Sequence, residues 1–459
     1  MPVIAMAAAM AALLLLPATA IARPLEEVLA LVYASNPNLQ AQRESLRRTD
    51  EEVPKALSNW RPKVNGEYAR TSARLQQDFG PDRERTFSAR PDALAIRLSQ
   101  PIYQGGRTTA AVREAEANVD AQRARLRDAE QRVFMDTVRA YVAVVSGEEI
   151  LELNDSNVRI LRELVRATRE RVRRGDATRT DMALAEARLA RAMSDRAGVL
   201  HKLEAMRSAF EAIVGERPGR LTMPGPTGFG PRSLRDLRDA ARTRHPSVSG
   251  TKAQERGSAA STDFAVGDLM PKVSLRLSAG RDLDTMLRER RRDELAAAVV
   301  LEVPIFQGGV EHARVRQAKI AQGQRRLETD INFRQLDDEA NAAWSEHEML
   351  TTQLPLFDRQ IEAAEIAFDG ATRELAAGAR TLTEVLAAEQ DLLNARVAKT
   401  QAIGQLVVSS YQVLEIAGLL DAVTLGLKVD PYDPEANYRK VRDKWFGLGE
   451  RSEEGTRRR

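Results

Sequence analysis

Residues 377–396 read AGARTLTEVLAAEQDLLNAR, a break that contains a glycine and is followed by an Ala- and Leu-rich helical pattern. Gly378 separates two long helical patterns, and a glycine in this place ends a helix with a left-handed cap. An arginine, a threonine and an acid come next: Arg380, Thr381 and Glu384. The stretch therefore predicts a tight turn at the tip of a helical hairpin.

The same design occurs once more in the chain, 203 positions earlier, with Gly175 in the place of Gly378. The polar residues of this copy are Thr178, Thr180, Asp181 and Glu186. The two copies align without a gap over 101–215 and 304–418. A repeat of this length indicates that each half of the chain builds the same structural unit.

The composition favours long helices over a compact mixed core. The chain has 459 residues, of which 5% are aromatic and 29% are charged, and Ala, Arg, Glu and Leu dominate. The 69 Lys and Arg residues are interleaved with 66 Asp and Glu residues, so the formal net charge is only +3. A nucleic-acid-binding surface needs basic residues clustered on one face, and we therefore expect no nucleic-acid partner.

The sequence offers little for an enzyme or a metal site. It contains no cysteine, which excludes disulfides, thiol catalysis and thiolate ligands. The four histidines are scattered, and His347, which precedes a glutamate, has no second histidine four residues on. We therefore expect no enzymatic activity, no cofactor and no metal site.

The first residues are typical of a secretory signal. Residues 1–22 combine an apolar core with small residues at two possible cleavage sites, after Ala20 or after Ala22. They depart from the usual pattern because no Lys or Arg precedes the apolar core. The alternative is an uncleaved membrane anchor, although the run is short for a stable span. A lipid-anchored mature terminus would need a cysteine, which the chain lacks.

Four stretches alternate apolar and polar residues with a period of two, as half-buried strands do. In PKVSLRLSAG, from Pro271, the apolar side chains fall on one face and Lys, Ser and Arg on the other. The predicted strands span about 62–72, 92–103, 271–280 and 296–306, and polar loops at about 75–91 and 281–293 join each pair. Strands of about ten residues suit a membrane, and they suit a soluble hairpin equally well.

Each strand pair ends in two glycines, Gly105-Gly106 and Gly308-Gly309, which let the chain leave the sheet in an unusual conformation. A long helix is predicted after each pair, over about 107–173 and 310–376, and a helix of this length rises about 100 Å. Apolar residues at spacings of three and four predict coiled-coil packing. The remaining predicted helices are shorter and cover about 23–55, 180–214, 233–260 and 382–417.

The duplication divides the chain into five segments. We expect a signal peptide at 1–22, a first repeat at 23–217 with its tip near 175, and a Gly/Pro-rich equatorial linker at 218–232. The second repeat covers 233–420, with its tip near 378. Residues 421–459 form an equatorial C-terminal segment at mid-height, and its last residues, RSEEGTRRR, are expected to be disordered.

The strand-to-helix junctions read QPIYQGGR from Gln100 and VPIFQGGV from Val303, in register with the two hairpin turns. Together these four motifs resemble the TolC family of outer-membrane channel proteins, over essentially the whole mature chain. The resemblance implies a mainly α fold with a membrane β-barrel, in which a homotrimer forms a twelve-stranded barrel that continues into a periplasmic α-barrel. Several chains are needed in any case, because closing a barrel takes about eight strands.

The resemblance also implies partners and a location. Family members lie in the outer membrane, in contact with its lipid, with most of the chain in the periplasm. They dock with a periplasmic adaptor and an inner-membrane transporter of the ABC, RND or similar type. Type I protein secretion and general efflux are favoured over a metal-specific role, because no metal-ligand cluster is found. From the residues alone, the alternative is a periplasmic coiled-coil adaptor or structural protein with a small soluble sheet.

A gate at the periplasmic tip follows from the same resemblance. The matching positions place Arg380 against Thr180 and Asp181, a charge-assisted latch between the two hairpins. The alternative is that Arg380 is one of many solvated helix charges. Glu384 fits the first of two acid rings that make such a constriction attract cations.

Two positions depart from the family's pattern. Ala387 stands where a second acid is expected, and Leu375 stands where a tyrosine can join the latch. The resemblance therefore implies a gate with one acid ring. It also implies that the tip residues present the adaptor docking surface: Gly175, Thr178, Gly378 and Thr381.

Overall fold

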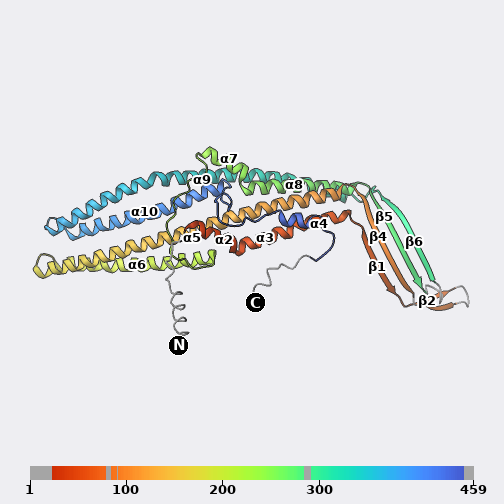
Figure 1. The fold of residues 1–459 in the computed structure, drawn as a ribbon, viewed down its shortest axis with the longest axis horizontal. Helices are drawn as coiled ribbons and strands as arrows, with labels where there is room; N and C mark the ends of the chain where they lie inside the picture. The colour runs from red at the N-terminus through yellow and green to blue at the C-terminus, as the bar shows by residue number, and fades with distance from the viewer. Residues whose placement is uncertain (1–22, 79–83, 90, 284–290, 449–459) are drawn as a thin grey trace, which may run out of the picture. The chain divides into compact units, whose positions relative to one another are not determined.

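The computed structural model describes residues 23–78, 84–89, 91–283 and 291–448 (Figure 1). The expected signal peptide and the expected disordered tail lie outside these residues. The described chain forms two compact units, each assembled from distant segments. Unit 1 comprises 23–42, 127–246 and 333–432, and unit 2 comprises 43–126, 247–332 and 433–448.

Two long helices dominate the chain. Helix α5 runs over Arg107–Arg174 and helix α9 over Val310–Ala376, with 68 and 67 residues. The interior of α5 holds no proline, so its ladder of backbone hydrogen bonds is uninterrupted, whereas α9 carries Pro355. Shorter helices follow the two tips, α6 over Arg179–Val214 and α10 over Leu382–Ile416.

The predicted helix at 23–55 is wrong as a single element. It is divided into α2 (Leu25–Ser35), α3 (Pro37–Asp50) and α4 (Glu52–Leu57). The first break lies at Asn36, which is extended with φ −65° and ψ 123°. Proline disfavours the helical conformation in the residue before it, because its ring clashes with that residue's backbone.

The second copy breaks at the equivalent place. Helix α7 covers Leu234–Arg244 and helix α8 covers Pro246–Val266. His245 between them is extended, with φ −60° and ψ 132°, because Pro246 follows it. The predicted single helix at 233–260 is therefore also wrong, for the same reason.

Unit 2 contains a four-stranded antiparallel sheet in the order β1-β4-β5-β6 (Figure 1). The strands are β1 (Lys63–Arg70), β4 (Asp92–Gln104), β5 (Lys272–Leu283) and β6 (Arg291–Glu302). The two copies of the repeat meet where β4 pairs with β5. The last strand ends before the expected 303–306, where Pro304 has no N–H to donate to a ladder.

A second, two-stranded sheet was not expected. Strands β2 (Ala73–Asp78) and β3 (Glu84–Ala89) pair antiparallel and occupy much of the stretch 75–91, which was predicted to be a polar loop. The prediction failed because these runs are rich in polar residues and lack a clean apolar alternation. The other predicted loop, 281–293, is shortened at both ends by β5 and β6.

The main core lies in unit 1. Its largest buried side chains are Phe134 and Tyr141 of α5, which pack with Leu25 of α2 and Leu414 of α10. The Tyr141 hydroxyl lies 2.8 Å from the Arg23 carbonyl oxygen and accepts the Thr222 N–H at 3.2 Å. A buried tyrosine with a satisfied hydroxyl fixes the chain that precedes α2 against the linker after α6.

Candidate functional site

The first hairpin tip is closed by a capping box. The Thr178 Oγ1 atom accepts the Asp181 N–H at 3.1 Å, and Asp181 Oδ2 accepts the Thr178 N–H at 2.9 Å. Gly175 precedes the box with φ +85°. These bonds satisfy backbone donors at the start of α6, and they lower the pKa of Asp181 because they favour its charged form.

The second tip repeats this geometry. Thr381 Oγ1 accepts the Glu384 N–H at 3.4 Å, and Glu384 Oε2 accepts the Thr381 N–H at 3.0 Å. Gly378 has φ +75°. The backbone hydrogen bond from Thr381 is the main reason that the pKa of Glu384 is lowered. Both acids that the sequence assigned to the gate therefore also cap the helix that follows them.

Arg380 is engaged within its own hairpin. Its Nε atom lies 2.7 Å from Glu374 Oε2, and both side chains are about half exposed. Among the described residues of a single chain, the structure does not bring Arg380 onto Thr180 or Asp181. Glu374, which was not among the predicted gate residues, therefore competes with the expected latch for Arg380.

An apolar cluster lies behind the tips and joins the two hairpins. It takes Val165 from α5, Ala185 from α6, Leu375 from α9 and Leu386 from α10. Leu375 is 8% exposed. The departure from tyrosine at this position therefore has a structural account, because leucine packs fully in a cluster that four helices share.

One acid lies buried next to this cluster. Glu389 of α10 is 7% exposed, and its burial raises its pKa to about 7. Arg188 of α6 partly offsets this by favouring the carboxylate. This residue was not predicted, because an acid in an Ala-rich helix is typical of a solvated charge.

The strand-to-helix junctions all use left-handed glycines. Gly105 and Gly106 have φ +63° and +82°, and Gly308 and Gly309 have +68° and +82°. The first junction is also crowded, since a Cβ on Gly105 would lie 2.5 Å from the Gly267 carbonyl oxygen. A Cβ on any of the other three would meet nothing within 4 Å. Only Gly105 thus needs to be glycine for space as well as for conformation.

The sheet has one apolar face that is open to the surroundings. The register places Val64, Leu98, Leu277 and Ala297 in one row across the four strands. The edge strand β6 is the most open, with Leu295, Val299 and Leu301 exposed by 86%, 70% and 63%. A monomeric soluble protein rarely leaves so many neighbouring apolar side chains exposed, whereas a lipid-facing sheet requires it.

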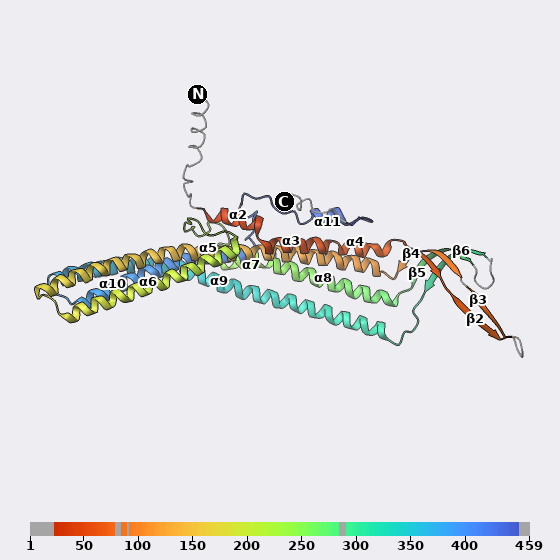
Figure 2. The ribbon, with the colours of Figure 1, turned by 90° about the horizontal axis from the view of Figure 1, so that it is seen from below.

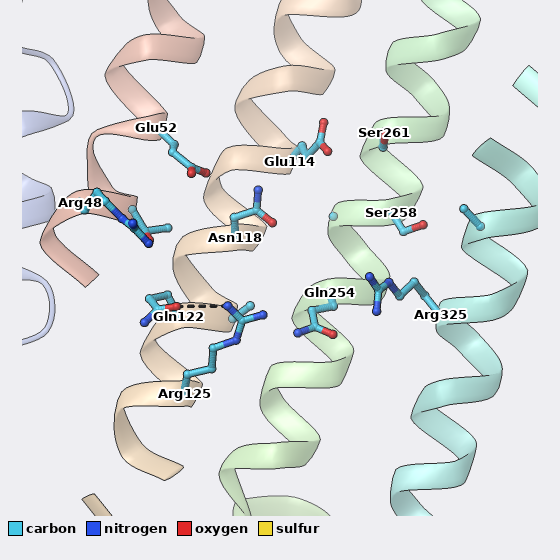
Figure 3. A pocket seen from close by; sticks show the side chains of 14 residues that line it. Arg48, Glu52, Glu114, Asn118, Gln122, Arg125, Gln254, Ser258, Ser261 and Arg325 are labelled. Carbon is cyan, nitrogen blue, oxygen red and sulfur yellow. Dashed lines mark hydrogen bonds between the residues drawn. The ribbon is translucent and has the colours of Figure 1, made fainter. Parts of the chain in front are cut away.

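A polar cleft of about 510 Å³ lies in unit 2 among α3, α4, α5, α8 and α9 (Figure 3). Arg125 donates to Gln122 Oε1 at 3.3 Å, and Glu114 has its pKa raised, first by burial and then by Glu52. Ligand sites are mostly apolar, and this lining mixes both charges with amides. The cleft is therefore better interpreted as a hydrated seam between helices.

Two features are absent from the described residues. Within these residues, no helix has an apolar run long enough to cross a membrane. Within the same residues, no group of three or more His, Cys, Asp or Glu side chains is arranged to hold a metal ion.

Comparison with known proteins finds one family whose model matches most of this chain. The family model described as "Outer membrane efflux protein" matches residues 28–216 and 237–419. The outer membrane efflux protein BepC of Brucella suis is 32% identical over 435 residues, covering 94% of this chain and 92% of that protein. The alkaline protease secretion protein AprF of Pseudomonas aeruginosa is 22% identical over 366 residues, covering 78% and 75%.

Solved structures share the fold. The outer-membrane channel OprN matches with a TM-score of 0.75 at 20% identity, covering 86% of this chain and 89% of that one. CusC matches with a TM-score of 0.77 at 16% identity, covering 86% and 92%. At these sequence identities the structural similarity shows only that the fold is shared.

Proposed function

Because the chain belongs to the outer membrane efflux protein family, we propose that three copies of it form an export duct across the outer membrane and the periplasm. The family and the TolC-like fold were both predicted from the sequence, and both are confirmed. The protein is an outer-membrane protein and not an enzyme.

One observation carries the proposal of an assembly. Within the described residues, the apolar sheet face belongs to four strands, and β1 and β6 are its two unpaired edges. Four strands are too few to close on themselves, since closure takes about eight. Pairing β6 of one copy with β1 of the next removes every open edge when the ring closes.

The tips are the proposed docking site for a periplasmic adaptor and an inner-membrane transporter. Gly175, Thr178, Gly378 and Thr381 are exposed, and each tip is held rigid by its capping box. A rigid, solvent-facing turn can present the same surface to a partner in every copy. In the closed state, Arg380 would leave Glu374 and bond to Thr180 and Asp181.

The proposed cargo follows the relatives. BepC is an efflux protein, and AprF and PrtF are protease secretion proteins. A further relative, CzcC, is a cobalt-zinc-cadmium resistance protein at 24% identity. We favour protein secretion or general efflux, and Glu384 would make the entrance attract cations.

Cross-linking tests the assembly directly, because the natural chain has no cysteine to interfere. Asn65→Cys on β1 is combined in turn with Ala296→Cys, Ala298→Cys and Val300→Cys on β6. The expected product in native membranes is a ladder that stops at three chains. The control pair is Arg97→Cys with Ser278→Cys, which are register partners within one chain and cannot join two copies.

Extraction completes the test. The protein should stay in the membrane fraction at high salt and leave it only with detergent. Release by salt alone, with no cross-linked trimer, would overturn the duct and favour the adaptor alternative. Purified trimers should also conduct ions in planar bilayers.

A further inference from the structure

The last described residues form an arm that runs along unit 2. Within this arm, helix α11 (Ala436–Val441) lies beside α3 and α4 (Figure 2). The Asn437 amide donates to Asp50 Oδ2 at 2.8 Å, and the Arg123 guanidinium stacks 5.2 Å from the centre of the Tyr438 ring. These contacts fix the arm against the helices and determine where its end lies.

The end of the arm is fastened just before the sheet begins. Arg61 donates to the Lys444 carbonyl oxygen at 2.9 Å, and its guanidinium lies 4.7 Å from the centre of the Trp445 ring. Strand β1 starts at Lys63, two residues after Arg61. Trp445 is thus held at the boundary between the helices and the strands.

The arm's end leaves large apolar side chains mostly exposed in the described part of the chain, although Arg61 lies over one side of the Trp445 ring. Trp445 is 58% exposed, Phe446 86% and Leu448 fully exposed. Two more aromatic residues are exposed at the same end of the sheet, Trp60 by 41% and Tyr103 by 46%. Tryptophan and tyrosine gather at membrane–water interfaces because their rings are apolar and their N–H and O–H groups still bind water.

The neighbourhood is also positively charged. Arg61 lies over the Trp445 ring, Lys444 precedes Trp445 in the chain, and Lys63 begins β1. The one acid next to them in the arm, Asp443, is paired with Arg442. Basic side chains next to apolar ones suit a phospholipid surface, because the rings enter the headgroup layer while the charges meet phosphates. The exposed rings lie where the apolar sheet face ends, which is where a membrane surface would be. A protein partner could bind at any height along the helices.

We propose that residues 444–448 form a lipid anchor, in which Trp445 and Phe446 enter the headgroup layer of the periplasmic leaflet of the outer membrane. The proposal rests on the proposed function, since it needs the sheet to cross that membrane. The anchor would fix the height of the helices below the membrane.

The test uses tryptophan fluorescence in the full-length protein. The chain has three tryptophans, so Trp60→Phe with Trp344→Phe leaves Trp445 as the single reporter. The protein is placed in vesicles of phosphatidylethanolamine and phosphatidylglycerol that carry a quencher attached near the headgroup. The matched control keeps only Trp344 of α9, which lies in unit 1.

A third reporter separates the anchor from the duct. Val299→Trp in a chain without other tryptophans places the ring on the apolar sheet face. Quenching of Trp445 about twofold or more above that of Trp344 supports the anchor. If the sheet reporter is quenched and Trp445 is not, the anchor is wrong and the duct stands. If the sheet reporter is not quenched either, the proposed function itself fails.

Two other outcomes would also overturn the anchor. Quenching of Trp445 by a soluble quencher alone would mean that the arm lies in water. A blue-shifted emission without lipid quenching would mean that a protein surface covers the ring. The double variant Trp445→Ala and Phe446→Ala should leave the tethers of Asn437 and Tyr438 intact and lower binding of the protein to empty vesicles.

Discussion

The Nε atom of Arg380 lies 2.7 Å from Glu374 Oε2, so the tip arginine is paired with an acid of its own hairpin. The family resemblance instead predicts a bond from Arg380 to Thr180 and Asp181 of the other hairpin. The observed pair is about half exposed, and such pairs contribute up to about 1 kcal/mol. Arg380 can therefore exchange partners when copies assemble, and Glu374 competes with the latch.

This competition predicts opposite effects of two substitutions. Arg380→Ser removes the latch and should raise single-channel conductance in planar bilayers. Glu374→Gln releases Arg380 for Thr180 and Asp181, and should lower the conductance or the open probability. A change of about 1 kcal/mol shifts a two-state gate about fivefold in population.

Arg373→Ser is the matched control, because Arg373 forms a similar exposed pair with Asp369 in the same helix. It removes the same charge near the tip but no predicted latch contact. If Arg373→Ser and Arg380→Ser change the conductance equally, the effect is one of net charge and the latch is wrong.

The capping boxes predict a second result. Thr178→Ala and Thr381→Ala should each lower the local unfolding free energy of a tip by about 1 kcal/mol, since each removes an N-cap acceptor. Hydrogen exchange of the first amides of α6 and α10 measures this. Thr180→Ala, one residue inside α6, should change exchange much less.

The pH dependence of the caps has a definite sign. The pKa of Asp181 and of Glu384 is lowered in the fold, so their contribution is present above their ordinary values of 3.8 and 4.5. It is lost as the pH falls below those values.

Asp181→Ala would remove a cap and a latch contact at once, and Thr180→Val is therefore the cleaner probe of the latch.

The long helices and the sheet were accessible to prediction because each has a simple period. A proline-free run fixes α5, and period-two alternation fixes β5. The breaks at Asn36 and His245 were missed, although a proline follows each of these residues in the sequence. They arise from a steric effect on the preceding residue, which a count of apolar positions does not register.

The tips were predicted only in part, because the partners of their charged side chains were not identified correctly. Asp181 and Glu384 each stand three residues after a threonine, which is the sequence signature of a capping box, but the prediction assigned them only to the gate. Arg380 is paired with Glu374 of its own hairpin, whereas the resemblance assigns it to Asp181 of the other, and spacing alone does not rank the two acids. Glu389 is buried next to a cluster that takes side chains from four helices, and a helical pattern taken alone does not indicate this.

The junction glycines predict a contrast between two neighbours. Alanine at Gly105 or Gly106 forces a left-handed conformation at a cost of about 1–2 kcal/mol. At Gly105 the new Cβ also lies 2.6 Å from the Met270 Cβ atom, so overpacking should add about 1–3 kcal/mol. Thermal unfolding of the folded protein should therefore show Gly105→Ala as clearly the less stable. Equal losses in the two variants would contradict the crowding at the first junction.

The buried acid predicts that the tip bundle loosens as the pH rises. The pKa of Glu389 is raised in the fold to about 7, from an ordinary value of 4.5. The protonated form is favoured by burial, so the packing is most stable below about pH 4.5 and weakens as the pH rises through 7. The full difference is on the order of 3 kcal/mol.

Glu389→Gln should abolish this dependence, because the amide stays neutral at every pH. Hydrogen exchange or limited proteolysis of the tips at pH 5 and pH 8 measures it, and the natural protein should open more readily at pH 8. Glu186→Gln is the control, since Glu186 of α6 is an exposed acid that is paired with Arg169 of α5 in the first hairpin. An unchanged pH profile in Glu389→Gln would mean that the carboxylate is charged in the assembled tip, and that Arg188 or another copy compensates it.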